Sequence, residues 1–385
     1  MQEAHIYVGI NGAGKSFKLG KIAKKALRLN RPVVAVSMSL NDKFPPNFKK
    51  RPYNFMGIKQ GRSVYRKAIE DALIACNREE HPVQINTLLK ILSYAGYDER
   101  IGFLVRGFDW SFESRFESES FTNNLSKDAV DNIFSLCLAY RRIHNENDSE
   151  NLHWVTHYSK FGSQSVLDIE SRFGEVPSGE ILSELLKHKA LLKKLKIIKD
   201  IRLFFEKENL NRKLFAINEM SSGELSLIST AFFLSHTLKD GGMLLIDEPE
   251  NSLHPEWQLA YISRIKDLFP YTDYQFHIAT HSPLIISGAQ KEENTLIHRF
   301  DGSRFKEIDS TSKNIEDALI DQFGIITPKN NALSERCIEI INSVIDKKIS
   351  KKEAIEKVSQ FKNSSYEETQ KQFLQSVQEL IRDEV

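Results

Sequence analysis

The chain has 385 residues, of which 41% are apolar, and 53 Lys and Arg against 52 Asp and Glu leave a net charge of +1. This composition is that of a globular protein with room for two modest domains, or for one large domain with an insertion. No apolar run approaches the roughly 18 to 20 residues of a spanning helix, so we expect no membrane association. Residues 1–5 lack the basic and apolar regions of a secretory signal, and we expect a cytoplasmic protein. Three distant cysteines without a CxxC argue against disulfides and thiolate metal sites.

Charge is unevenly distributed along the chain. Residues 1–70 hold fifteen Lys and Arg and three acids, a net charge of +12, which leaves −11 for the rest. Such a split predicts an anionic partner for the N-terminal part, whether nucleotide phosphates, DNA or another nucleic acid, or an acidic protein surface. A solvated basic helix face, paired with acids elsewhere in the fold, would give the same pattern, and the sequence leaves both interpretations open.

The first predicted elements are a strand, a glycine loop and a helix. Residues 4–8 form an apolar run that leads into the loop at residues 9–16. Apolar side chains then recur at helical spacing, at Leu19, Ile22, Ala23, Ala26 and Leu27. A second buried strand at residues 33–36 completes a strand–helix–strand unit, whose crossover implies a parallel sheet.

The middle of the chain has a different character. Few glycines occur there, and amphipathic stretches at residues 85–95, 130–141 and 181–205 are broken by strand-like runs near 101–105 and 153–156. We therefore predict a mainly helical insertion.

Sheet character returns in the last third of the chain, at residues 243–247, at 275–280 and in a hairpin over 295–308 with its turn at 301–303. After about residue 315 the pattern is helical. The expected fold is α/β, with residues 1–70 and 212–312 forming the two parts of one head, residues 71–211 the insertion and residues 313–385 a helical tail.

The glycine loop carries the first chemical motif. Residues 9–16 match G-x-x-x-x-G-K-S between a strand and a helix, which is the context of a phosphate-binding loop. The glycines let backbone N–H groups surround phosphates, Lys15 reaches the β- and γ-phosphates, and the Ser16 hydroxyl ligates Mg²⁺. The predicted nucleotide-binding residues of this segment are Asn11, Gly12, Ala13, Gly14, Lys15, Ser16 and Phe17.

A second motif is the apolar strand at 243–246, which ends in the two carboxylates Asp247 and Glu248. We expect Asp247 to hold Mg²⁺ together with Ser16, and Glu248 to polarise the attacking water.

Two further segments accompany these motifs. Ser221-Ser222-Gly223 precedes an apolar helix and places small residues and free N–H groups at its N-terminus. His281 ends the next predicted strand, where its imidazole would lie one strand away from the carboxylates.

The four segments, in this order, resemble the ABC-type ATPase superfamily over about residues 4–70 and 212–310. The DEPENSLHP run at residues 247–255 is similar to the soluble DNA-repair, SMC and OLD-like branch. Transporter subunits, by contrast, carry a Gly-Gly-Gln signature and a small-residue loop after the glutamate. The segments at residues 39–44 and 53–57 also resemble AAA-family ATPases of bacterial anti-phage defence systems. The fold implied is a P-loop ABC-type ATPase head.

The resemblance implies a mechanism with ATP and Mg²⁺ as cofactors. Two heads would face each other head-to-tail in a homodimer or higher oligomer, with ATP between the loop of one chain and Ser221, Ser222 and Gly223 of the other. Lys15, Glu248 and His281 would be catalytic, His281 by sensing the γ-phosphate within its own chain. Gln60, which follows the run at 53–57, is the candidate for the family's Gln-loop residue.

One expected feature is missing from the pattern. Family members commonly have a small β-subdomain before the glycine loop, often with an aromatic residue that stacks on adenine, whereas here the first strand starts at Ala4. Base recognition is therefore unaccounted for, and ATP rather than GTP rests on the resemblance.

Three functions stay open at this stage. The first is a switch ATPase that controls a partner effector, a nuclease or toxin, in anti-phage defence or DNA maintenance. The second is an OLD-like nuclease acting itself on DNA, although the tail looks too short for a nuclease domain and lacks Asp-x-Asp. The third, an ABC transporter subunit, is disfavoured by the signature and by the LHP segment.

Overall fold

The computed structural model describes residues 3–10, 12–45, 52–61, 63–76, 85–116, 126–143, 152–156, 178–207, 213–251, 253–270, 272–308, 331–364 and 368–383. None of the helices in these ranges is long and apolar enough to cross a membrane.

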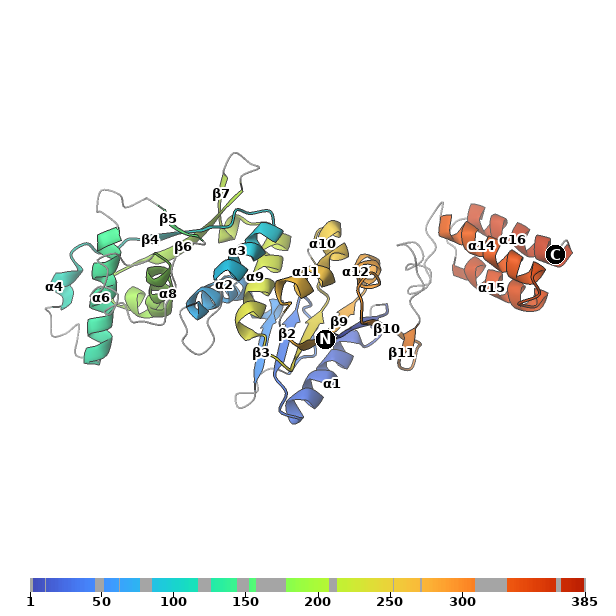
Figure 1. The fold of residues 1–385 in the computed structure, drawn as a ribbon, viewed down its shortest axis with the longest axis horizontal. Coiled ribbons are helices and arrows are strands. Elements are labelled where there is room, and N and C mark those ends of the chain that lie inside the picture. Colours follow the sequence, from blue (N-terminus) through green and yellow to red (C-terminus); the bar gives the residue numbers. More distant parts are fainter. Residues whose placement is uncertain are drawn as a thin grey trace.

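A seven-stranded sheet forms the centre of the head (Figure 1). Its strands are β1 (Glu3–Val8), β2 (Val33–Ser37), β3 (Tyr53–Gly57), β8 (Gly242–Asp247), β9 (Tyr274–Thr280), β10 (Thr295–Phe300) and β11 (Phe305–Ile308). They lie in the order β11-β10-β1-β9-β8-β2-β3, and every neighbouring pair is parallel except the β10–β11 hairpin. The α/β class, the parallel sheet and the hairpin expected from the sequence are confirmed.

Helix α1 (Lys15–Arg28) covers one face of this sheet (Figure 1). Its buried Leu19, Ala23 and Leu27 pack on strand residues such as Val33 and Leu245. Lys21, Lys24, Lys25 and Arg28 lie on the opposite, exposed face, whereas Lys15 at its first position is buried. The amphipathic pattern of α1 therefore places its apolar side against the sheet that carries the expected site.

The other face of the sheet belongs to a larger apolar cluster. The helices that contribute to it are α2 (Ser63–Ala75), α3 (Ile85–Tyr94), α9 (Ser222–Thr237), α11 (Tyr261–Leu268) and α12 (Pro283–Ala289). The short helix α10 (Pro255–Leu259) precedes α11, and the 3₁₀ turns η1 (Ile58–Gln60) and η4 (Ile217–Glu219) precede α2 and α9. Helix α9 is buried around most of its circumference, and small Ser and Thr residues are buried there together with the apolar ones.

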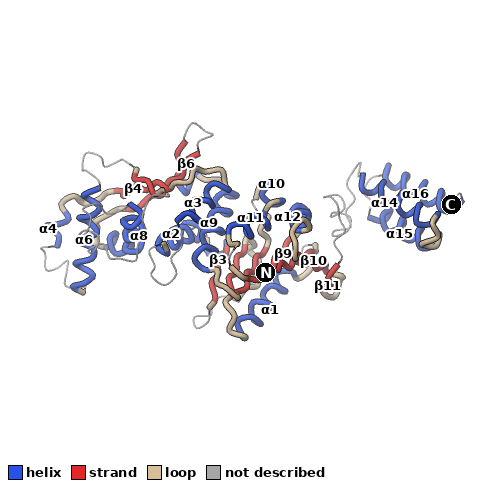
Figure 2. The backbone as a smooth tube through the Cα atoms, viewed as in Figure 1, coloured by secondary structure: helices blue, strands red, loops and turns tan. Residues whose placement is uncertain are grey.

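The insertion contains a second sheet as well as helices. Its helices are α4 (Phe112–Phe116), α6 (Lys127–Ile143) and α8 (Ser178–Lys194), and its antiparallel strands, in the order β5-β4-β6-β7, are β4 (Ile101–Arg106), β5 (His153–Val155), β6 (Asp200–Lys207) and β7 (Lys213–Ala216). In Figure 2 the strands labelled β4 and β6 run together, apart from those of the head sheet. The helices dominate this region, as expected, and β4 and β5 coincide with the two strand-like runs.

The helix expected over residues 181–205 is wrong in its second half. Helix α8 ends at Lys194, Lys196 takes a left-handed φ of 58°, and the chain then enters β6. Ile201, Leu203 and Phe205 are buried on one side of β6 and alternate with less buried residues. This period of two is that of a half-buried strand, and tertiary contacts with β4 decide it over local helix propensity.

The domain boundary expected at residue 70 falls inside a helix, and the one expected at residue 211 falls just before a strand. Helix α2 spans residue 70 and packs on both α9 and α8, and β7 starts just after residue 211. The large apolar cluster also runs without a break from the head into the insertion. Head and insertion therefore share a core along α2 and α9.

The tail is helical, as expected, with α14 (Asn331–Ile345), α15 (Lys351–Ser364) and α16 (Glu368–Asp383). These three helices have a separate apolar cluster that includes Leu333, Val358 and Leu374. Residues 315–330, where the helical pattern was expected to begin, lie outside the described residues.

A stacked group of rings lies across β1, β9 and β10 on the face that α1 covers. The His277 ring stacks on His5 at 4.7 Å between centroids, and the Tyr7 hydroxyl oxygen lies 3.2 Å from His277 Nδ1. Burial, reinforced by the nearby His5 and His298, lowers the pKa of His277 to about 3. The folded head therefore holds this imidazole neutral.

We expect the stability of the head to fall as the pH drops below about 6.5. The unfolded chain takes up a proton at the ordinary histidine pKa of 6.5, whereas folded His277 does so only near pH 3. Acidification from about pH 7.5 to about pH 5 should cost about 2 kcal/mol through this residue. Urea unfolding at both pH values measures this, and His277→Gln should lose correspondingly less. Equal losses in the two proteins would contradict the assignment.

Candidate functional site

The phosphate loop connects β1 to α1, as the motif predicts. Gly12 and Gly14 have φ angles of 85° and 81°, a left-handed conformation that favours glycine. The Lys15 ammonium donates to the backbone oxygens of Gly9 (2.7 Å) and Ile10 (3.2 Å). Burial lowers the pKa of Lys15 even though nearby acids oppose the shift. The loop therefore closes around a buried lysine; Asn11 lies outside the described residues.

Ser16 and Asp247 meet beside this loop although they lie 231 residues apart in sequence. The Ser16 hydroxyl donates to Asp247 Oδ1 at 3.0 Å, while Asp247 Oδ2 is buried and has no hydrogen-bond partner within the described ranges. Burial raises the pKa of Asp247 to about 7. A hydroxyl and a buried, half-satisfied carboxylate are oxygen ligands that a hard cation prefers, so these residues fit Mg²⁺.

Glu248 leaves the strand in a strained conformation. Its φ of 53° is left-handed, which is uncommon for a residue with a side chain, and its N–H donates to Ala279 O at 2.8 Å. The Asn251 amide donates to Glu248 Oε2 (3.2 Å) and to Met38 O (3.0 Å). The backbone and Asn251 together hold the carboxylate at the tip of β8. The sequence analysis did not single out Asn251; its position three residues after Glu248 was the available signal.

His281 follows β9, the neighbour of β8, as expected. Its ring Nδ1 lies 3.0 Å from Glu250 Oε1 and 4.0 Å from Glu248 Oε1. Its backbone N–H donates to Glu250 Oε1 at 2.6 Å. Glu250 is buried, and burial raises its pKa. Glu250 therefore positions His281. This role could not be predicted from the sequence because the contact joins two separate loops.

Residues 221–223, called the signature segment below, form the N-terminus of α9. Ser221 is the N-cap, and it forms a reciprocal capping box with Glu224, whose N–H donates to Ser221 Oγ at 3.3 Å. Glu224 also accepts from the Tyr97 hydroxyl (3.1 Å) and pairs with Lys207. Burial raises the pKa of Glu224, but hydrogen bonds from Lys207 and Ser221 outweigh it and hold that pKa below its usual value.

The exposure of this segment matters for its function. Ser221 and Ser222 are exposed, whereas Gly223 is buried. In the described part of the chain, no hydrogen bond joins Ser221 or Ser222 to the phosphate loop of the same molecule. A helix N-terminus with free N–H groups is therefore left open to an outside anion.

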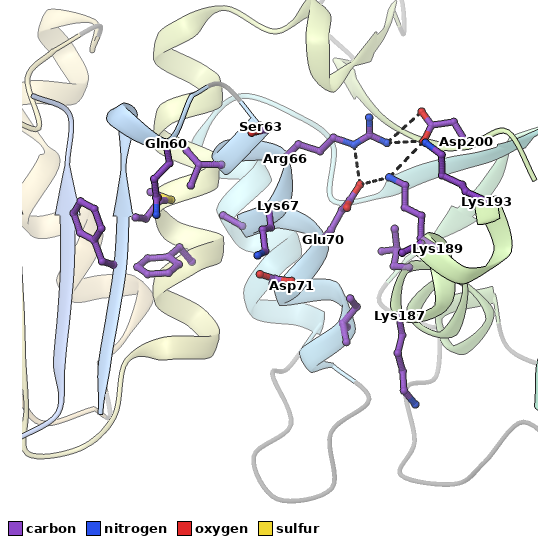
Figure 3. A pocket seen from close by; sticks show the side chains of 18 residues that line it. Gln60, Ser63, Arg66, Lys67, Glu70, Asp71, Lys187, Lys189, Lys193 and Asp200 are labelled. Carbon is purple, nitrogen blue, oxygen red and sulfur yellow. Dashed lines mark hydrogen bonds and ion pairs between the residues drawn. The ribbon is translucent and has the colours of Figure 1, made fainter. Parts of the chain in front are cut away.

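Gln60 lies at the end of η1, next to the edge strand β3. Its Oε1 accepts from Gly57 N–H at 3.2 Å, and its side chain is exposed. Strand β2 separates β3 from β8, so the structure does not bring Gln60 against Asp247. Gln60 instead lines a cavity of about 920 Å³ between β3, α2 and α8 (Figure 3).

Basic side chains from α2 and from α8 line this cavity. Figure 3 shows Arg66 of α2 facing Lys189 and Lys193 of α8, with Glu70 and Asp200 between them. Arg66 Nε lies 2.8 Å from Glu70 Oε1, and Lys189 Nζ lies 2.8 Å from the same oxygen. Acidic neighbours thus compensate part of the N-terminal charge, whereas Lys21, Lys24, Lys25 and Arg28 of α1 stay exposed.

The chain is similar to a known protein family over most of its length. Residues 24–287, more than half of the chain, match the family described as "AAA domain, putative AbiEii toxin, Type IV TA system". The match begins after the phosphate loop.

Two curated relatives are similar over short segments. The chain is 38% identical over 90 residues to the "Retron Vc95 probable ATPase" of Vibrio cholerae serotype O1 biovar El Tor, covering 22% of this chain and 17% of the relative. It is 33% identical over 79 residues to the "Septu protein PtuA" of Bacillus mycoides (strain KBAB4), covering 19% and 11%. The matched segments thus span less than a fifth of each relative.

One solved structure was also compared with this chain: the Smc head domain with an extended coiled coil, bound to the C-terminal domain of ScpA, from Pyrococcus furiosus. The alignment covers 80% of this chain and 90% of that chain, at 12% identity and a TM-score of 0.26. The extent of the family match, together with a phosphate loop facing two carboxylates on a parallel sheet, decides the classification. The chain belongs to the AAA-domain family that is described as putative AbiEii toxin of type IV toxin–antitoxin systems.

Proposed function

We propose that this protein is an ATP-hydrolysing switch subunit that dimerises around ATP and controls a partner effector, a nuclease or toxin, in anti-phage defence. The observation that carries the proposal is the convergence of Ser16, Asp247, Glu248 and His281 at the phosphate loop. Three separate segments of the chain meet there with the chemistry that phosphoryl transfer to water requires.

Each residue has a role that its surroundings support. Lys15 would neutralise the β- and γ-phosphates, and Ser16 and Asp247 would hold Mg²⁺, which supplies charge neutralisation on those phosphates when bound. Glu248, fixed by Asn251, would accept a proton from the attacking water. His281, held by Glu250, would contact the γ-phosphate.

The dimer follows from the signature segment. Ser221, Ser222 and Gly223 form a capped helix N-terminus, and the first two residues are exposed. A second copy in head-to-tail orientation would place this anion-binding end on its partner's ATP. Hydrolysis would then release the heads and move the insertion, which shares a core with the head through α2 and α9.

The names of the two relatives support a role in defence. One is called a retron ATPase and the other a Septu protein, and each shares a short segment with this chain. The exposed cations of α1 support a further anionic partner, DNA or another nucleic acid. Lys49, Lys50 and Arg51, which belong to the same basic run, lie outside the described residues.

A plaque assay tests the proposal in cells that carry the gene together with its neighbouring genes. The wild type should reduce phage plating, and Lys15→Ala should lose this protection because the lysine at the phosphates is gone. Lys352→Ala is the matched control, since it removes an exposed lysine from the tail helix α15. Full protection by Lys15→Ala would contradict an ATP-driven switch. Co-purification with ATP or ADP should then show an effector whose binding depends on the nucleotide.

A further inference from the structure

The β10–β11 hairpin brings two aromatic rings to the start of the phosphate loop. Phe300 ends β10, and Gly9 follows the end of the paired strand β1. A Cβ atom built on Gly9 would lie 3.4 Å from Phe300 Cβ, so the two residues are close neighbours at the start of the loop. Phe305 begins β11, and its ring centroid lies 5.3 Å from that of Phe300.

The metal-binding pair fixes the direction in which a bound nucleotide would run. Ser16 and Asp247 would hold the Mg²⁺ that accompanies the β- and γ-phosphates, so they would mark that end of the triphosphate. Asp247 ends β8, which lies beyond β9 on one side of β1. The nucleoside end must therefore leave the loop on the other side of β1, where β10 and β11 lie.

The two rings rest on a firm base. Phe305 packs edge-on against Tyr7 at 5.5 Å between ring centroids, and Tyr7 stacks on His298 at 5.0 Å. Burial lowers the pKa of His298 as well as that of His277, which disfavours the charged forms of these two imidazoles. Phe300 and Phe305 are only half-buried, and they keep part of their surface open.

We propose that Phe300 and Phe305 form the base-stacking platform for a purine nucleotide whose phosphates lie in the loop at residues 9–16. The inference rests on the proposed function and extends it to base binding. Stacking on an aromatic face suits any base, and purines have the larger face, so the platform favours purine nucleotides without choosing between ATP and GTP.

Calorimetric binding of two ligands with Mg²⁺ tests the platform. A non-hydrolysable ATP analogue has both base and phosphates, whereas tripolyphosphate has only the phosphates. Phe300→Leu keeps an apolar side chain but removes the ring, and it should weaken binding of the analogue about tenfold, or about 1.4 kcal/mol, because stacking is lost. Its affinity for tripolyphosphate should stay unchanged. Phe300→Tyr should restore binding of the analogue.

Phe55→Leu is the matched control, since Phe55 is a half-buried aromatic residue on β3 at the opposite edge of the sheet. The platform is overturned if Phe300→Leu binds the analogue like the wild type, or if it loses both ligands equally. It is also overturned if only Phe17→Leu, which alters the exposed ring after Ser16, weakens the analogue selectively. A wild type that binds neither ligand would refute the proposed function itself, and the platform with it.

Discussion

Glu248→Gln should lower ATP turnover by at least the ~10²-fold typical of losing a general base. The substitution preserves the shape of the side chain and a carbonyl that Asn251 can still contact, so ATP and Mg²⁺ should continue to bind. Because ATP would lie between the two heads, the unhydrolysed complex should accumulate as a closed dimer. Steady-state ATPase assays and light scattering with ATP and with ADP measure both effects.

Asp247→Asn is the matched comparison on the neighbouring residue. It removes the buried carboxylate that contacts Ser16, so Mg²⁺-dependent nucleotide binding should weaken and no trapped dimer should form. If Glu248→Gln kept nearly normal turnover, Glu248 would not be the base. The interpretation of the chain as a hydrolysis-driven switch would then fail as well.

The second large effect concerns the contact between heads. Ser222→Arg places a bulky cation at the exposed N-terminus of α9, where it opposes both the helix dipole and the approach of a second head. ATPase activity should be abolished, while ATP binding to the chain's own loop stays largely intact. Lys15→Ala should also be inactive, because it removes the cation at the phosphates.

Mixing these two inactive proteins separates action within a chain from action between chains. A mixed dimer keeps one site in which Lys15 from one chain and Ser222 from the other are both intact. Random pairing of equal amounts should restore about a quarter of the wild-type activity. Lack of recovery, despite mixed dimers confirmed by differential tagging, would count against the head-to-tail arrangement.

Local sequence was sufficient for the parts of the fold in which short-range pattern and final environment agree. The loop at residues 9–16 lies between a strand and a helix because its glycines and the flanking periodicity favour that geometry. The buried strands at 33–37 and 242–247 contain the apolar runs 33–36 and 243–246, as is typical of parallel strands covered on both faces. The candidate residues Lys15, Ser16, Asp247, Glu248 and His281 follow from the same segments.

Tertiary structure decided what depends on contacts between distant segments. The amphipathic stretch was expected to be helical through residue 205, yet its last residues pair with β4 as part of β6. Glu250 gains its role because the loops after β8 and β9 lie side by side, and Asn251 gains a second partner in Met38, which follows β2. Phe300 and Phe305 become neighbours of the phosphate loop because β10 pairs with β1, almost 300 residues earlier in the chain. Side-chain pattern reports the burial of a segment, whereas its neighbours are set by the order of the strands, which no local pattern encodes.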